Sequence, residues 1–193
     1  YQYITKNFDG YGASDSKVNQ AFLGVKFDPS GKLRGEFKAG YGQKKFDSSI
    51  PGRSTKTDTW VAYANLVQDF SKRTSLGLSA SRSFQDDGNY ANNAPYYQTL
   101  AALTFQHYFT HKIGGTAMVG YNRSEYQEET AEPITGIFKK RTDNAYSAGV
   151  GVFYNIQKYL KARLDYNYIK RDSNFEGYSF NENRAMFKVV YSP

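Results

Sequence analysis

The stretch 145–170 alternates between apolar and polar residues along most of its length. From Tyr146 to Ile156 every second residue is apolar, and the residues between them are mostly Ser, Gly or Asn. The alternation resumes after Gln157-Lys158 and continues to Tyr168. Because successive side chains of a strand point to opposite faces, this pattern predicts two strands joined by a tight turn. Each arm alternates over about eleven residues, roughly twice an ordinary strand but close to what a tilted strand needs to cross a bilayer.

The same unit occurs four times in the chain. It consists of a strand, a short turn, a second strand and then a longer polar loop, and we expect ten strands in all. The segment Tyr1–Lys6 also alternates, but it is only six residues long. Polar loops are expected at about 7–19, 47–56, 86–95, 127–142 and 172–182. The four hairpins are VKFDPSGKLRGEFKAGY, VQDFSKRTSLGLSASR, QHYFTHKIGGTAMVGY and FYNIQKYLKARLDYNY.

Short turns at one end of the strands and long loops at the other are typical of outer-membrane barrels, whose short turns face the periplasm. The apolar face also carries aromatic residues at two levels. Trp60 and Phe70 are ten residues apart, which for a tilted strand spans roughly the 25 Å apolar band of such barrels. The sequence therefore predicts one all-β domain over residues 1–193, an antiparallel transmembrane β-barrel. The expected belts are Trp60, Tyr97, Tyr121, Tyr146 and Tyr166 at the loop end, and Phe27, Phe70, Phe109 and Tyr154 at the turn end.

The unusual features of the amino-acid composition agree with a membrane barrel. The 193 residues include 18 Tyr, 14 Phe and 17 Gly but only 5 Pro, and tyrosine suits both strands and membrane interfaces. A mean hydropathy of −0.70 is typical of a soluble protein. Barrel strands, however, dilute their apolar residues with polar residues that face the lumen. The alternative is a soluble β-sandwich or lipocalin-like barrel; in a sandwich the charged face would simply be solvated. Long strands and unequal turn lengths favour the membrane barrel.

The C-terminal residues resemble a known family. The strand Arg184–Tyr191 is similar to the C-terminal assembly signal of bacterial outer-membrane proteins, although Ser192 and Pro193 follow its final aromatic. The stretch YNYIKRDSNFEGYSFNENR, residues 166–184, resembles the closing hairpin of β-barrel porins encoded beside exopolysaccharide-export systems in Gram-negative bacteria. The resemblance implies a channel in the bacterial outer membrane, with polysaccharide export as an expected activity.

Members of that family are generally longer than this chain. A closed barrel must pair its first strand with its last, and Tyr1–Lys6 is too short to span a bilayer. Either preceding residues complete a ten-stranded barrel, or the chain is the C-terminal part of a larger barrel. We favour the larger barrel, because barrels of about sixteen strands hold an aqueous channel whereas long charged side chains would fill a narrow one.

Charged residues on the polar face are the candidates for function. Near the turn end there are six basic and two acidic residues, and a basic excess along a water-filled wall would favour the passage of anions. The simpler alternative is that Glu36 and Asp165 pair with neighbouring cations and only stiffen the wall. The predicted pore-lining residues are Lys26, Arg34, Glu36, Lys38, Lys161, Arg163, Asp165 and Lys188.

Other chemistry finds little support in the sequence. The chain has no Cys, and His107 and His111 fall on opposite sides of a predicted turn, so we expect no metal site and no cofactor. No Ser is obviously placed beside His107, so we expect no enzymatic activity. The formal net charge of +7 does not indicate nucleic-acid binding, because basic and aromatic residues fall on opposite faces.

Two kinds of partner and two functions follow as expectations. The barrel should contact the lipid bilayer, and charged external loops could bridge divalent cations with lipopolysaccharide or fold inwards as a constriction. One function is a channel for anionic solutes or exported polysaccharide. The alternative is a non-conducting structural or adapter barrel that docks periplasmic export proteins or other outer-membrane proteins. The loop residues concerned are Asp86, Asp87, Glu125, Glu128, Glu129, Glu132, Lys139, Lys140 and Arg141.

Overall fold

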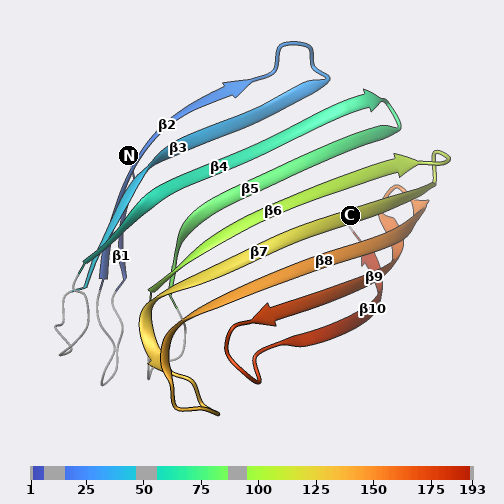
Figure 1. The fold of residues 1–193 in the computed structure, drawn as a ribbon. Coiled ribbons are helices and arrows are strands. Elements are labelled where there is room, and N and C mark those ends of the chain that lie inside the picture. Colours follow the sequence, from blue (N-terminus) through green and yellow to red (C-terminus); the bar gives the residue numbers. More distant parts are fainter. Residues whose placement is uncertain (1, 7–15, 47–55, 87–94, 192–193) are drawn as a thin grey trace.

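The computed structural model describes residues 2–6, 16–46, 56–86 and 95–191, and these form one antiparallel sheet of ten strands. Each strand pairs with the strand that precedes it and the one that follows it in the sequence. Figure 1 shows the sheet bent into a trough, with the first and last strands at its two edges. Those edge strands each have one partner among the described residues, so the sheet is open. The predicted all-β, ten-stranded antiparallel architecture is confirmed. The described residues contain no helix long and apolar enough to cross a membrane.

Most strands are far longer than those of ordinary sheets. The first has five residues and the others have 12 to 20, as the long alternating segments predict. The strands are β1 (Gln2–Lys6), β2 (Ser16–Phe27), β3 (Leu33–Phe46), β4 (Lys56–Ser71), β5 (Thr74–Asp86), β6 (Pro95–Tyr108), β7 (Ile113–Ala131), β8 (Phe138–Gln157), β9 (Leu160–Ser173) and β10 (Phe180–Tyr191).

The predicted short turns lie where the sequence places them. In the turn between β2 and β3, Gly31 has a positive φ of 65° and donates its backbone N–H to the carboxylate of Asp28 at 2.9 Å. A glycine accepts this left-handed conformation without strain, and an aspartate is well suited to close such a turn. The short β4–β5, β6–β7 and β8–β9 connections lie at the same end of the sheet.

The predicted loop boundaries are wrong at the other end. Strand β7 extends to Ala131 and strand β8 begins at Phe138, so most of the predicted 127–142 loop is strand. Likewise β2 begins at Ser16, and β10 begins at Phe180. The physical reason is that hydrogen-bonded pairing continues beyond the alternating segments. Glu129 stands opposite Lys140 in the register, although neither residue belongs to an apolar stripe.

The two faces of the sheet differ in chemistry, as alternation predicts. A row of residues in register across the sheet shows the apolar face: Leu66, Leu78, Leu103, Val119, Ala148 and Tyr168. On this face Val150 is 60% exposed, whereas on the other face Phe153 is only 2% exposed. Shielded side chains are expected on the concave side of a bent sheet. We therefore name the apolar face the outer face and the opposite face the inner face. Tyr146, Leu164 and Tyr166 also lie on the outer face and are exposed.

The sheet forks between β4 and β5 at the loop end. These two strands pair from Ala62 opposite Arg82 to the turn, and beyond that point β4 pairs with β3 alone and β5 with β6 alone. The fork is filled by a small core of Val18, Val61 and Phe84. These buried side chains close a gap that backbone hydrogen bonds do not bridge.

The two faces can be tested by placing a charge on each. Val150 lies midway along the outer face of its strand, and Met118 lies on the inner face opposite Gly149. We expect Val150→Lys to destabilise the barrel by about 2–4 kcal/mol, the usual cost of a lysine in the middle of the bilayer. Met118→Lys should cost less than about 1 kcal/mol, because its charge faces water. Urea unfolding in lipid vesicles measures both, and equal costs would contradict the assignment of faces.

Candidate pore wall and mouth

All eight predicted pore-lining residues lie on the inner face, but they form two separate groups. Lys26 stands opposite Glu36, and Arg163 stands opposite Lys188. Strands β4 to β8 separate the two groups within the sheet, so the structure does not bring them together as one cluster. The first group is Lys26, Arg34, Glu36 and Lys38 on β2 and β3, and the second is Lys161, Arg163, Asp165 and Lys188 on β9 and β10.

In the first group, two of the three cations are paired. Lys38 forms an ion pair with Glu36 on its own strand, and Arg34 forms one with Asp69 of β4. Asp69 was not among the predicted residues, because its partner lies 35 positions away and sequence alone does not give strand register. Within the described residues, Lys26 makes no ion pair.

In the second group, the arginine is held in a fixed position. The Nε of Arg163 donates to both carboxylate oxygens of Asp165, at 2.7 and 2.8 Å, and its Nη2 donates to Thr116 at 3.1 Å. The ammonium of Lys161 lies 4.0 Å from the centre of the Phe153 ring, within the range of a cation–π contact. Lys188 makes no ion pair within the described part of the chain.

These contacts leave an uneven balance of charge at the turn end. The six basic side chains of the two groups face three acidic ones, Glu36, Asp69 and Asp165, an excess of three positive charges. The carboxylates pair with neighbouring cations, as the simpler alternative expected. The charges of three lysines are not neutralised by a carboxylate among the described residues: Lys26, Lys161 and Lys188.

Between the two groups the inner face is neutral. On β5, β6 and β7 as far as Tyr126, the inner positions carry no charged residue, by the register of the described strands. Hydroxyls and amides are common there, for example Ser79, Gln106 and Thr116. The inner face thus has two basic margins on either side of a neutral, hydrogen-bonding floor.

A second charged cluster lies at the loop end of the inner face; the sequence predicts Arg141 as an external-loop residue and does not single out its partners Asp143 and Arg171. Arg141 of β8 donates to Asp143 through Nε and Nη2 at 2.7 to 3.1 Å, and Arg171 of β9 forms an ion pair with the same carboxylate. The guanidinium of Arg141 also lies 4.6 Å from the ring centre of Tyr126 and 4.2 Å from that of Tyr178.

A cleft of about 450 Å³, lined mostly by polar side chains, is bordered by Arg141, Asp143, Arg171 and Tyr126. We name it the mouth cleft, and its other lining residues include Tyr96, Gln98, Asn122, Ser124 and Phe180. A signal for the arginines was present in the sequence. Arg141 and Asp143 continue the polar parity of Ser147 and Gly149, but the neighbouring Thr142 and Asn144 are polar too, so the segment resembles a loop.

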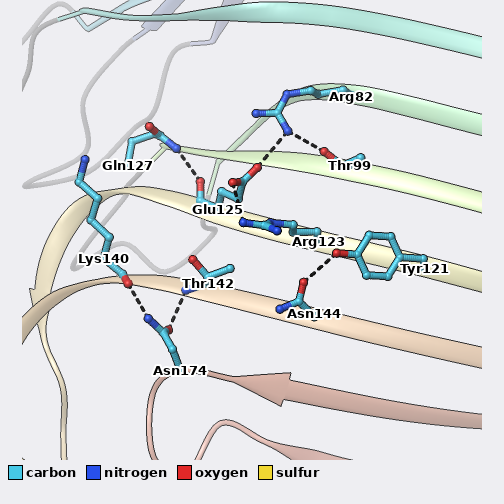
Figure 2. Close-up of polar contacts among 10 residues, drawn as sticks. All are labelled: Arg82, Thr99, Tyr121, Arg123, Glu125, Gln127, Lys140, Thr142, Asn144 and Asn174. Atoms are coloured by element: carbon cyan, nitrogen blue, oxygen red, sulfur yellow. Dashed lines mark hydrogen bonds and ion pairs between the residues drawn. The ribbon is translucent and has the colours of Figure 1, made fainter.

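Two external connections, 132–137 and 174–179, are fastened to each other above the mouth cleft. Glu132 is 3% exposed, and its carboxylate accepts the backbone N–H of Glu176 at 2.6 Å and pairs with Lys139 at 3.0 Å. Thr135 also donates to this carboxylate. Asn174 adds two bonds of 2.8 Å to the backbone of β8, one at Lys140 and one at Thr142. Figure 2 shows Asn174 bridging these two residues. Glu132 is therefore a structural anchor in this structure, whereas Asp87 lies outside the described residues.

His107 has ordinary structural contacts. Its Nδ1 lies 2.9 Å from the hydroxyl of Thr74, and its ring packs near Phe105 and Phe109. The described residues contain no group of three His, Cys, Asp or Glu side chains arranged to hold a metal ion.

The anchor at Glu132 predicts how the external connections respond to pH. Hydrogen bonds from Thr135, Glu176 and Lys139 lower the pKa of Glu132 from 4.5 to about 2. A lowered folded-state pKa contributes stability above the unfolded value, and that stability is lost as pH falls from about 4.5 through about 2. We expect hydrogen-exchange protection of the Glu176 amide, corrected for intrinsic exchange, to stay constant from pH 7 to about 5 and to fall below that. Glu132→Gln should reduce it at pH 7, and protection that is independent of both changes would contradict the anchor.

Comparison with known proteins identifies a matching family and a solved structure with a similar fold. The chain matches the protein family described as "Putative beta-barrel porin 2" over residues 3–192. Among solved structures it is similar to OmpTdeltaL8, a loop L8 deletion mutant of OmpT, an outer membrane protein of Vibrio cholerae. That similarity has a TM-score of 0.52 at 17% identity, and it covers 96% of this chain but 56% of the other. The chain thus spans a little over half of that protein's length. No curated protein matches the chain.

The family match covers almost the whole chain, so the chain belongs to this family of β-barrel porins. Together with the fold, the match places the protein in the bacterial outer membrane. The outer face of the sheet is accordingly the face that meets lipid, and the inner face is the one that lines the lumen.

Proposed function

We propose that this porin-family barrel is a channel through which anionic solutes, including acidic polysaccharide, cross the outer membrane. The observation that supports the proposal is the distribution of charge on the inner face. At the turn end six basic side chains stand against three acidic ones, and none of these nine residues lies on the outer face. A wall with excess positive charge raises the local concentration of anions in the water beside it.

Ion pairing distinguishes the residues that we expect to matter from those that we do not. Arg163 and Asp165 form a neutral pair, and such a pair contributes little net field along the pore. Lys26 and Lys188 have no carboxylate partner among the described residues. We therefore assign the anion preference to the unpaired lysines, and we assign to the pairs a role in holding the wall in shape.

The neutral floor and the mouth cleft are compatible with a cargo rich in hydroxyl groups. Serine, threonine and glutamine side chains on β5 to β7 can exchange hydrogen bonds with such a molecule as it moves, without holding it through a strong charge. At the mouth, Arg171 uses one nitrogen for Asp143 and keeps further donors for an anionic group. A polysaccharide bearing carboxylates matches both features, so it is the cargo that we favour within the anionic class.

Ion selectivity of the full-length protein in planar bilayers tests this proposal. We expect the reversal potential in a salt gradient to show anion preference, and Lys26→Gln with Lys188→Gln should reduce it clearly. The matched control is Arg163→Gln with Asp165→Asn, which removes one charge of each sign and should leave the preference nearly unchanged.

A wild-type channel without anion preference would overturn the assignment of charge. A properly folded barrel with no conductance would instead favour the alternative of a structural or adapter barrel. We also expect no enzymatic activity, because the proposal requires none.

A further inference from the structure

A pair of arginines interrupts the apolar outer face at the loop end. Arg82 of β5 stands in register with Ala62 and Thr99, and Arg123 of β7 stands in register with Thr99 and Asn144. Each is two residues beyond an outer-face position, Arg82 after Ala80 and Arg123 after Tyr121, and therefore has the same parity as the lipid-facing side chains. These cations do not point into the lumen.

The tyrosines just below them mark where the apolar band ends. The hydroxyl of Tyr121 donates to Asn144 at 2.8 Å, and that of Tyr166 donates to Asn183 at 2.6 Å. Tyr41 likewise donates to Asp58. Each ring thus directs its polar end towards the loop end, as tyrosines do at a membrane–water interface. The two arginines lie at the level of lipid headgroups, directly above this belt.

The arginines share one carboxylate, as Figure 2 shows. Arg82 donates to Glu125 at 3.0 Å and to Thr99 at 2.7 Å, while Arg123 donates to the other oxygen of Glu125 at 3.1 Å. We name Arg82, Glu125 and Arg123 the outer-face triad, and its formal charge is +1. The strand assignment also corrects the prediction that Glu125 belongs to an external loop.

The two arginines differ in how accessible they are. The side chain of Arg82 is 14% exposed, and its guanidinium lies 4.9 Å from the Trp60 ring centre and 5.2 Å from that of Tyr97. Arg123 is 44% exposed and uses only Nη2 for its bond to Glu125. Its other guanidinium nitrogens have no partner among the described residues. Arg82 and Glu125 therefore position Arg123, which presents free donors to the lipid headgroups.

An apolar groove of about 420 Å³ lies on the same face, closer to the middle of the membrane. It is lined by Leu103, Phe105, Val119, Val150, Tyr166 and other residues of β6 to β9. Val119 precedes Arg123 by four residues on the same strand, a separation of roughly 13 Å. A molecule seated here would have an anionic head at Arg123 and hydrocarbon in the groove.

We propose that the outer-face triad and this groove bind a phosphorylated glycolipid of the outer leaflet, with a phosphate group on Arg123. The long-loop end of such barrels is external, so the lipid at this level belongs to the outer leaflet. Phosphate matches the fork of guanidinium donors, and a carboxylate-bearing solute in water would not reach a site that lipid surrounds. The site is independent of what the barrel passes through its lumen.

Native mass spectrometry of the detergent-solubilised full-length protein tests the proposal with three lipid probes. These are bisphosphorylated lipid A, the same lipid after dephosphorylation, and phosphatidylglycerol. We expect lipid A to bind most tightly and Arg123→Gln to weaken it about tenfold or more, the usual effect of losing a hydrogen bond to a charged group. Retained heat-modifiable migration on gels would show that the variant still folds.

The matched control is Arg184→Gln. Arg184 is also an exposed arginine paired with a glutamate two positions away, Glu182, but it lies on the inner face. We expect this variant to bind lipid A as the wild type does. Equal binding of dephosphorylated lipid A, equal binding of phosphatidylglycerol, or undiminished binding by Arg123→Gln would each overturn the proposal.

Discussion

A strand that crosses a bilayer must satisfy every backbone amide and carbonyl through its neighbours, because hydrocarbon offers no hydrogen-bond partners. This constraint organises the whole chain. Strands β2 to β10 pair in unbroken sequential register over long stretches, and the few irregularities lie close to the ends of the pairings, as at Gln157 and Glu129. Once the backbone is paired, alternation alone decides which side chain meets lipid and which meets the lumen.

Under the proposed function, the charges on the inner face have two separate roles. Arg163 pairs with Asp165 and also donates to Thr116 on β7, the next strand but one, so such pairs fix the shape of the wall. Unpaired lysines leave a net field, which is the property that a selective channel needs. A count of charges from the sequence cannot separate the two kinds, because pairing depends on which strands lie side by side. Asp69 shows this clearly, since its carboxylate neutralises Arg34 on the neighbouring strand.

Alternation and turn chemistry were sufficient to predict much of the fold. Ten strands, the Asp28–Gly31 turn and the outward positions of Tyr146, Val150 and Leu164 are all confirmed. The strand ends were not predictable in the same way. Beyond the membrane both faces can be polar, so the alternation that reveals a strand disappears while its hydrogen bonds continue.

That limit explains why the sequence does not predict the mouth cleft. Arg141 and Asp143 lie in just such an extension of β8. For a related reason, the sequence does not indicate the pairing of Arg82 and Arg123. A single charge on an apolar parity looks like an irregularity until its neighbours across the sheet, Glu125 and Trp60, are known.

The apolar face of the sheet meets lipid, and its aromatic belt lies at the membrane–water interface. Trp60, the only tryptophan, is 56% exposed on that face at the loop end and reports on the belt directly. Its fluorescence in vesicles of lipids brominated at different depths is the most direct test. We predict strong quenching by lipids brominated near the headgroups and weaker quenching by lipids brominated at the chain ends. Fluorescence unaffected by brominated lipids but quenched by acrylamide from the aqueous phase would contradict the account.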